Sequence, residues 1–312
     1  MTLSAATART HAGWRDILLL LSIGLFWGLN WPAVRVMLDE VPPFTMRAAA
    51  FTVGALVLLA LVRLRGERLR PAATDWPALI PVALLSIFGF NMLTAFGQLH
   101  TETGRAAIIA FTMPVWATLL SVVWLNERIT WERATALLLG MAGLALLLGE
   151  DLLDQARSPL GSLFALGSAV SWAAGTVLLK RRTWSLTPLA LAAWMLALSA
   201  LPAGLVALLL ERPWTLSAPS ALVLLVFAYH VLLPMVWCYA AWVVVVARLP
   251  APIAAIGTLT IPVVGVSSAI LLLEEPASIR TFGALVLVVS GVALVLVVPG
   301  LRARSLRGAA ET

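Results

Sequence analysis

The feature that most constrains this chain is a succession of apolar runs of about 20 residues, separated by short breaks of charged residues, proline or glycine. An α-helix rises about 1.5 Å per residue, so each run is long enough to cross the roughly 30 Å hydrocarbon core of a bilayer. The runs predict ten transmembrane helices. Their expected ranges are 16–37, 43–62, 76–98, 105–125, 131–149, 160–179, 186–210, 219–246, 251–273 and 280–299.

The composition excludes several other classes of protein. Of the 312 residues, 61% are hydrophobic and 12% are charged, a balance that a soluble domain could not solvate. The net charge of +6 comes from short basic clusters between the apolar runs, so no basic face of useful length is present for nucleic acid. The only cysteine, Cys238, lies inside an apolar run, which excludes a disulfide framework and a thiolate metal site. We therefore expect an all-α integral membrane protein with no cofactor.

The distribution of basic residues predicts the orientation of the helices. If the N-terminus lies inside, about 15 of the 21 Lys and Arg residues fall in cytoplasmic segments, as the positive-inside rule requires. We therefore expect both tails, 1–15 and 300–312, to be cytoplasmic.

An internal repeat divides the chain into two halves of five helices. The segment from Ala106 to Val115 recurs from Ala254 to Val263, a shift of 148 residues, while a shift of 145 aligns Trp27 with Trp172. The repeats are expected at 16–149 and 160–299. Because each repeat has an odd number of helices, the second enters the membrane from the opposite side, which is the inverted arrangement common in secondary transporters.

The repeated motifs resemble a known family. They are Trp27-Gly28-x-Asn30, the Ala-Ala-Ile-x3-Thr-x-Pro of the fourth and ninth runs, and the Leu-Asn-Glu and Leu-Glu-Glu that follow them. Together they are similar to the EamA-type repeat of the drug/metabolite transporter superfamily, over essentially the whole chain. The second repeat departs from the pattern at Ala173, where the first has Gly28. The resemblance implies a bacterial inner-membrane exporter with ten spans, similar to the YddG-like amino-acid exporters.

Ionisable residues inside a membrane are functional candidates because burying their charge is unfavourable. We expect no Asp, Glu, Lys or Arg near the middle of any span, which leaves His230 as the one titratable group. It could carry a proton or form a structural hydrogen bond between helices. Trp27, Asn30 and Trp31 share one stripe of the first helix, so they suit either an amphipathic solute or interhelical packing.

The remaining cavity candidates lie on five other helices. Helical spacing places His230, Pro234 and Trp237 on one face, and prolines within the fourth and ninth runs are either hinges or static kinks. The further cavity residues are Asn91, Thr94, Thr112, Trp116, Trp172, Thr176, Tyr229, Tyr239 and Thr260, and the hinge candidates are Pro114 and Pro262.

Two glutamates precede the fifth and tenth runs at opposite faces of the membrane. Glu127 and Glu275 are each expected to be stabilised by the positive end of a helix dipole. The alternative is that they latch a gate by pairing with Arg128 or Arg280.

The resemblance and the candidate residues together favour a monomeric carrier that exports small neutral amino acids, including aromatic ones, by alternating access. The substrate could instead be another small amphipathic metabolite or a drug. A flippase for lipid-linked substrates would need basic residues in a lateral groove, and an enzyme would need a nucleophile with its base, a metal cluster or paired acids. A channel would need a ring of charges. Since we expect no carboxylate within the spans, transport should not be driven by a proton or sodium gradient.

Overall fold

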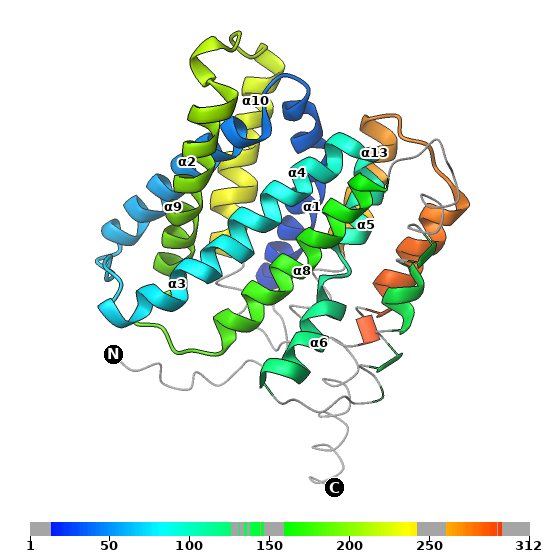
Figure 1. Cartoon of the computed structure of the whole chain (residues 1–312), viewed down its shortest axis with the longest axis horizontal. Coiled ribbons are helices and arrows are strands. Elements are labelled where there is room, and N and C mark those ends of the chain that lie inside the picture. The colour runs from blue at the N-terminus through cyan, green and yellow to red at the C-terminus, as the bar shows by residue number, and fades with distance from the viewer. Residues whose placement is uncertain are drawn as a thin grey trace, which may run out of the picture.

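The computed structural model of the chain describes residues 14–125, 159–241 and 260–291, together with 131, 134–135, 138–143, 145–146 and 293–294. This described part is a bundle of helices without a strand (Figure 1). The α-helices are α1 (Trp14–Leu38), α2 (Pro43–Leu64), α3 (Trp76–Ala83), α4 (Phe90–His100), α5 (Thr103–Ala110), α6 (Met113–Leu125), α8 (Leu160–Lys180), α9 (Pro188–Val206), α10 (Ala221–His230) and α13 (Thr260–Leu272).

Six helical segments of the described part are long and apolar enough to cross a membrane. They are Leu18–Leu38, Pro43–Leu64, Ala73–His100, Leu160–Leu179, Pro188–Glu211 and Ala221–Ala241. These segments match the first, second, third, sixth, seventh and eighth predicted spans to within a few residues at most ends. Two shorter apolar helices, Thr260–Leu272 and Ile279–Gly291, lie in the ninth and tenth predicted spans. The chain is therefore a multi-pass α-helical membrane protein.

The fourth predicted span, 105–125, is not one continuous helix. α5 ends at Ala110 and α6 begins at Met113, with a turn between them. Pro114, the second residue of α6, explains the break, because a proline nitrogen has no hydrogen to donate to the carbonyl of Ala110. The expected kink is thus a discontinuity between two helices.

α2 and α9 pack side by side in opposite directions (Figure 1). Glu211, at the end of α9's extension, accepts hydrogen bonds at the start of α2, while Glu67, just after α2, accepts one at the start of α9. A helix of 22 residues is about 33 Å long, so these contacts lie at opposite ends of the pair. Phe51 and Leu58 of α2 are fully buried in the apolar core that this pair builds with α3.

Two other helix pairs bring their backbones close together. α1 packs on α13, where a Cβ added at Gly28 would lie 2.5 Å from Cβ of Val264, so no larger residue fits without a shift. α4 packs on α8, where a Cβ at Gly97 would lie 3.4 Å from the backbone nitrogen of Ala165. Small residues at such positions let membrane helices approach closely.

Three long helices contain a wider, π-helical stretch. These stretches are η2 (Leu84–Gly89), η3 (Ala207–Glu211) and η5 (Val231–Cys238). A proline precedes η2 and η3 by a few residues, at Pro81 and Pro202, and Pro234 lies within η5. Since proline removes one backbone hydrogen bond, it accounts for the local widening, which is frequent at functional sites.

The segments between the long helices gather at two ends of the bundle. Glu40 accepts hydrogen bonds from Ser220 at one end. At the other end Asp75, in the short 3₁₀ turn η1 (Ala73–Asp75), bonds Ser185 and pairs with Arg182 at 3.3 Å. Each contact joins residues more than 100 positions apart, so both ends are closed by links between distant parts of the chain.

Candidate functional site

The centre of the bundle contains a polar cluster from three helices. The ring of His230, at the end of α10, is completely buried. Its Nδ1 lies 2.6 Å from Oδ1 of Asn30 on α1, and its Nε2 lies 3.3 Å from Nη1 of Arg47 on α2. A guanidinium is only a donor, so Nε2 accepts and Nδ1–H donates to the amide oxygen. The contacts therefore define a neutral histidine with one tautomer.

Arg47 corrects the expectation that no charged residue reaches the interior of the spans. It is the fifth residue of α2 and is only 2% exposed, and its long side chain extends inward to His230, which lies halfway along Ala221–Ala241. Within the described residues its Nε has no hydrogen-bond partner. The signal was present in the sequence, because an arginine four positions inside a predicted span must either extend to water or find polar groups in the bundle.

Aromatic rings extend the polar cluster along α1. Trp27 donates through Nε1 to the carbonyl of Pro234 at 3.1 Å, and its ring meets that of Tyr239 edge to face at 5.7 Å. Tyr229 donates to the carbonyl of Phe26 at 2.8 Å. Tryptophan and tyrosine combine a large apolar face with one donor, so this wall suits an amphipathic solute.

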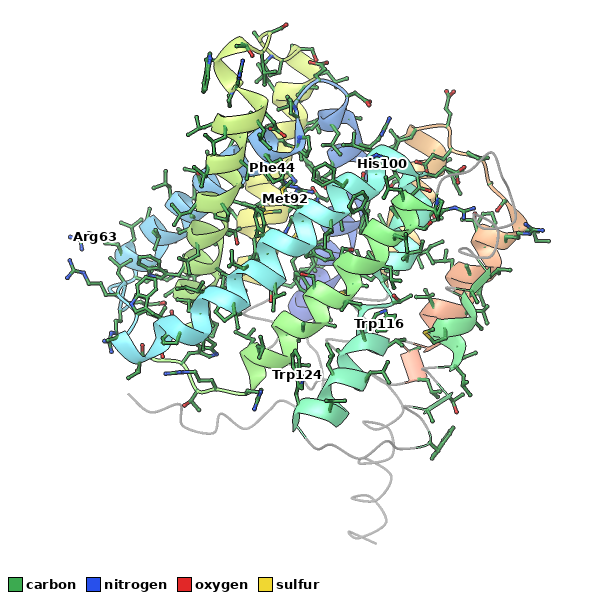
Figure 2. The ribbon with its side chains drawn as sticks, viewed as in Figure 1. Phe44, Arg63, Met92, His100, Trp116 and Trp124 are labelled. Atoms are coloured by element: carbon green, nitrogen blue, oxygen red, sulfur yellow. The ribbon has the colours of Figure 1, made fainter. Side chains whose placement is uncertain are left out.

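A second aromatic group lies beside the break between α5 and α6. Trp31 is 7% exposed and its ring lies 6.2 Å from that of Phe111 in the turn. Trp116 lies on α6 (Figure 2). It donates to Oγ1 of Thr112 at 3.1 Å, and the hydroxyl of Thr112 in turn donates to the carbonyl of Ile109. Trp27, Trp31 and Trp116 thus pack around one apolar cluster of the interior.

Several predicted cavity residues make their contacts elsewhere. Asn91 and Thr94 are buried, but each bonds to a backbone carbonyl of its own helix segment. Trp172 packs on Phe90 at 4.8 Å. Thr176 is half-buried on α8, and Thr260 and Pro262 form the first turn of α13.

Trp237 does not share a face with His230, contrary to the prediction. It is 43% exposed and donates to Oγ of Ser22, which lies two helical turns from Asn30 along α1. The reason is η5, whose wider turns rotate successive residues by less than the roughly 100° of an α-helix. Pro234 stays buried on the His230 side.

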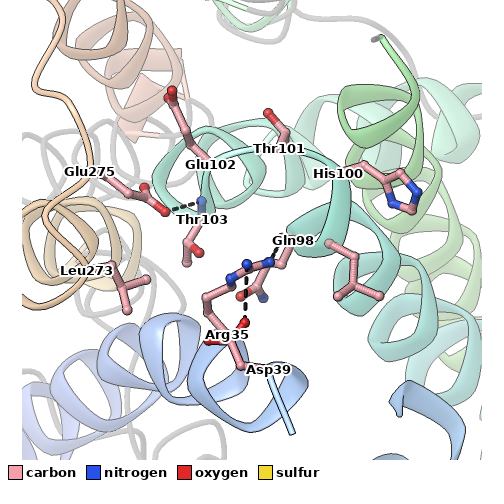
Figure 3. A pocket seen from close by; sticks show the side chains of 10 residues that line it. Arg35, Asp39, Gln98, His100, Thr101, Glu102, Thr103, Leu273 and Glu275 are labelled. Atoms are coloured by element: carbon pink, nitrogen blue, oxygen red, sulfur yellow. Dashed lines mark hydrogen bonds and ion pairs between the residues drawn. The ribbon is translucent and has the colours of Figure 1, made fainter. Parts of the chain in front are cut away.

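A cavity of about 500 Å³ opens at the end of the bundle where α1, α4, α5 and α13 meet (Figure 3). Arg35 spans it, pairing with Asp39 at 3.2 Å and donating to the carbonyl of Gln98 at 2.7 Å. The lining residues are Arg35, Asp39, Gln98, Leu99, His100, Thr101, Glu102, Thr103, Leu273 and Glu275. We call this cavity the polar vestibule. No group of three or more potential metal ligands occurs among the described residues.

Glu275 corrects a second expectation. It does cap a helix N-terminus, but the helix is α5 and not the one that follows it in sequence. Its carboxylate accepts hydrogen bonds from the backbone nitrogens of Thr103 and Gly104, the latter at 2.8 Å. Sequence spacing could not reveal this cap, because the two partners are about 170 residues apart. Glu127, the expected equivalent, lies outside the described residues.

A model of the EamA-like transporter family matches residues 14–149 and, a second time, residues 159–297. The chain belongs to this family. The resemblance drawn from the repeated motifs is thereby confirmed, and its relatives bear the names of transporters and not of enzymes.

Two relatives and one solved structure align with nearly all of this EamA-like transporter. The uncharacterized transporter YvbV of Bacillus subtilis (strain 168) is 32% identical over 285 residues, which cover 90% of this chain and 91% of YvbV. A probable amino-acid metabolite efflux pump of Escherichia coli (strain K12) is 25% identical over 306 residues, which cover 93% of this chain and 97% of the pump. A crystal structure with 22% identity aligns over 95% of this chain and 99% of its own, with a TM-score of 0.66, and so has the same fold.

Proposed function

We propose that this transporter is a bacterial inner-membrane carrier that exports small neutral amino acids, aromatic ones included, by alternating access. The observation that carries the proposal is the buried cluster of Asn30, Arg47 and His230 beside the rings of Trp27 and Tyr239. Burying polar and charged groups at this depth costs free energy, and such groups typically mark substrate or ion pathways. Aromatic walls discriminate weakly among apolar side chains. The name of the Escherichia coli relative, an amino-acid metabolite efflux pump, points the same way.

We further propose ten transmembrane helices in two inverted repeats, the first at 16–149 and the second at 160–299, with both termini in the cytoplasm. The double match of one family model supports the repeat. The helix contacts support the inversion. α2 and α9, which would be equivalent second helices, are antiparallel, and the packing of α10 on α1 corresponds to that of α4 on α8. Two such bundles can rock around a central site.

The break between α5 and α6 also supports this proposal. Discontinuous helices at the substrate site are common in secondary transporters, because backbone groups at the break become available to the cargo. Pro114 and Pro262 would then act as hinges near the two equivalent sites. Thr112, Trp116 and Trp31 would line the adjacent part of the cavity.

Reconstitution tests the proposal directly. Purified transporter in liposomes is given labelled phenylalanine, leucine, threonine and alanine in separate assays, and protein-free liposomes serve as the control. We expect saturable flux and counterflow for at least one of these amino acids. In cells, expression should speed efflux of an amino acid loaded as a dipeptide. Flux no faster than in protein-free liposomes for every amino acid would contradict the function, provided that the protein is shown to be folded in the liposomes.

A further inference from the structure

Arg47 carries a buried charge with no carboxylate beside it in the described part of the chain. Its side chain is 2% exposed and bonds to the neutral ring of His230 through Nη1, while its Nε–H is unpaired. Two other described cations pair with acids near the ends of the bundle, Arg35 with Asp39 and Arg182 with Asp75. A buried guanidinium without a counter-ion is destabilising, so its retention calls for a partner.

The groups that Arg47 leaves free are the ones that recognise a carboxylate. A guanidinium offers N–H donors in a planar fork, and the edge formed by Nε and one Nη matches the two oxygens of a carboxylate. His230 holds the Nη1 side of the fork, and Asn30 in turn fixes the ring of His230 at 2.6 Å. The guanidinium is therefore oriented in advance by a chain of two hydrogen bonds.

The inverted repeat offers an internal comparison for this cluster. A shift of 145 residues, which aligns Pro43 with Pro188 at the starts of α2 and α9, converts the three cluster positions to apolar or small residues. Asn30 corresponds to Gly175 and Arg47 to Ala192 in the second repeat, and His230 corresponds to Leu85 in the first. The equivalent place is tightly filled, because the backbone of Ser86 lies too close to Gly175 for any side chain there. Packing of the fold alone thus does not require a polar trio.

We propose that Arg47, positioned by His230 and Asn30, binds the carboxylate of the transported amino acid. The carrier then selects its cargo by the carboxylate, while the wall of Trp27 and Tyr239 receives the rest of the molecule. This inference rests on the proposed function, since it names the group of the amino acid that the same site recognises.

Substrate analogues test the inference on the unmodified protein. Proteoliposomes are given whichever of phenylalanine, leucine and threonine moves fastest, and in parallel its amide and its decarboxylated amine, which lack the carboxylate. We expect the amide and the amine to move at least about tenfold more slowly at equal low concentration, as loss of a charge-assisted pair implies. Equal transport of all three compounds would overturn the carboxylate site but leave the proposed function standing. No flux of any amino acid would overturn the proposed function itself.

Variants locate the selectivity at Arg47. Arg47→Gln should raise the KM for the amino acid about 10- to 100-fold, and Arg47→Lys should raise it less, because lysine keeps the charge but not the fork. The matched control is Arg63→Gln, at the exposed end of the same helix, where the side chain points away from the bundle (Figure 2). Thermal unfolding in detergent establishes that each variant is folded. A wild-type KM in folded Arg47→Gln would refute the inference. If neither Arg47 variant folds, the analogue series on the wild type decides.

Discussion

Glu211 accepts hydrogen bonds from both the backbone nitrogen and the hydroxyl of Thr45, at 2.6 and 2.7 Å, and so fastens the end of α9's extension to the first turn of α2. At the other end of the same two helices, Glu67 accepts from the hydroxyl of Thr187. The same kind of contact is thus made twice with the roles of the helices exchanged. Because α2 and α9 are tied at both ends, we expect them to move as one body during transport.

Removing the first of these carboxylates should destabilise the bundle measurably. Glu211→Ala leaves two backbone donors and one hydroxyl at the start of α2 without their acceptor, and we expect a loss of about 1–2 kcal/mol, typical of a missing helix cap. Glu67→Ala removes the hydrogen bond from the hydroxyl of Thr187 and should cost less. Thermal unfolding in detergent compares the stability of the two variants. A larger loss of stability for Glu67→Ala would show that the number of hydrogen bonds at these helix ends does not determine the effect.

Gly28→Ala should strongly impair folding or transport. The added methyl group would lie 2.5 Å from Cβ and Cγ1 of Val264, and rotation of the valine cannot move its Cβ. Gly204→Ala is the matched control, because the nearest atom to its new methyl group is 4.0 Å away and alanine favours a helix by up to about 1 kcal/mol. Fluorescence-detected size exclusion and thermal stability measure the outcome. Recovery in Gly28→Ala/Val264→Gly would identify the collision as the cause.

Substitutions in the buried interior and substitutions of exposed tryptophans should differ in their effect on transport. Asn30→Ala and Trp31→Ala alter the buried interior and should reduce flux about tenfold or more at matched expression. Trp237→Ala should have a much smaller effect, because this ring is 43% exposed and donates to Ser22. Trp214→Ala should also have a small effect, because its ring is 68% exposed. Similar losses at all four positions would mean that the assay reports folding and not binding.

The sequence predicted the long helices well because membrane crossing leaves a signal in every residue of a run. It did not predict the break after Ala110, since one proline is compatible with a kink or with two separate helices. Trp237 was misplaced because π-helical turns cannot be read from hydrophobicity, and its face was counted at a fixed 100° per residue. Arg47 was overlooked because its backbone lies near a helix end while its guanidinium lies well inside.

Labelling of introduced cysteines checks the orientation. In a Cys238→Ala background, a cysteine at Arg68 should react only from the cytoplasmic side and one at Ala218 only from the periplasmic side, because about 15 of the 21 basic residues fall on the side of Arg68. Cys238 is a free cysteine, and alanine is only slightly smaller, so Cys238→Ala should leave the fold unchanged. Reaction of both positions from the same side would contradict an odd number of crossings between them.

Flux measurements with imposed gradients test whether transport is coupled. His230 is held neutral between Arg47 and Asn30, and gaining a proton would remove its acceptor for the guanidinium. We therefore expect no uphill accumulation when a pH or sodium gradient is applied across proteoliposomes. Accumulation driven by either gradient would disprove uncoupled transport. Loss of only the pH-driven part in His230→Gln would then assign the coupling to this ring.

The break between α5 and α6 gives the interior a negative pole, which complements the positive charge of Arg47. α5 is eight residues long, about 12 Å, and its N-terminus is neutralised by Glu275, while its carbonyl end stops inside the bundle at Ala110. The end of a helix dipole there corresponds to roughly half a negative charge. The positive guanidinium of Arg47 is linked to α1 through His230 and Asn30, while the turn after Ala110 contacts α1 through Phe111 and Trp31. A molecule that carries one charge of each sign would find an opposite charge for both of them, whereas a simple cation or anion would find one for its single charge only.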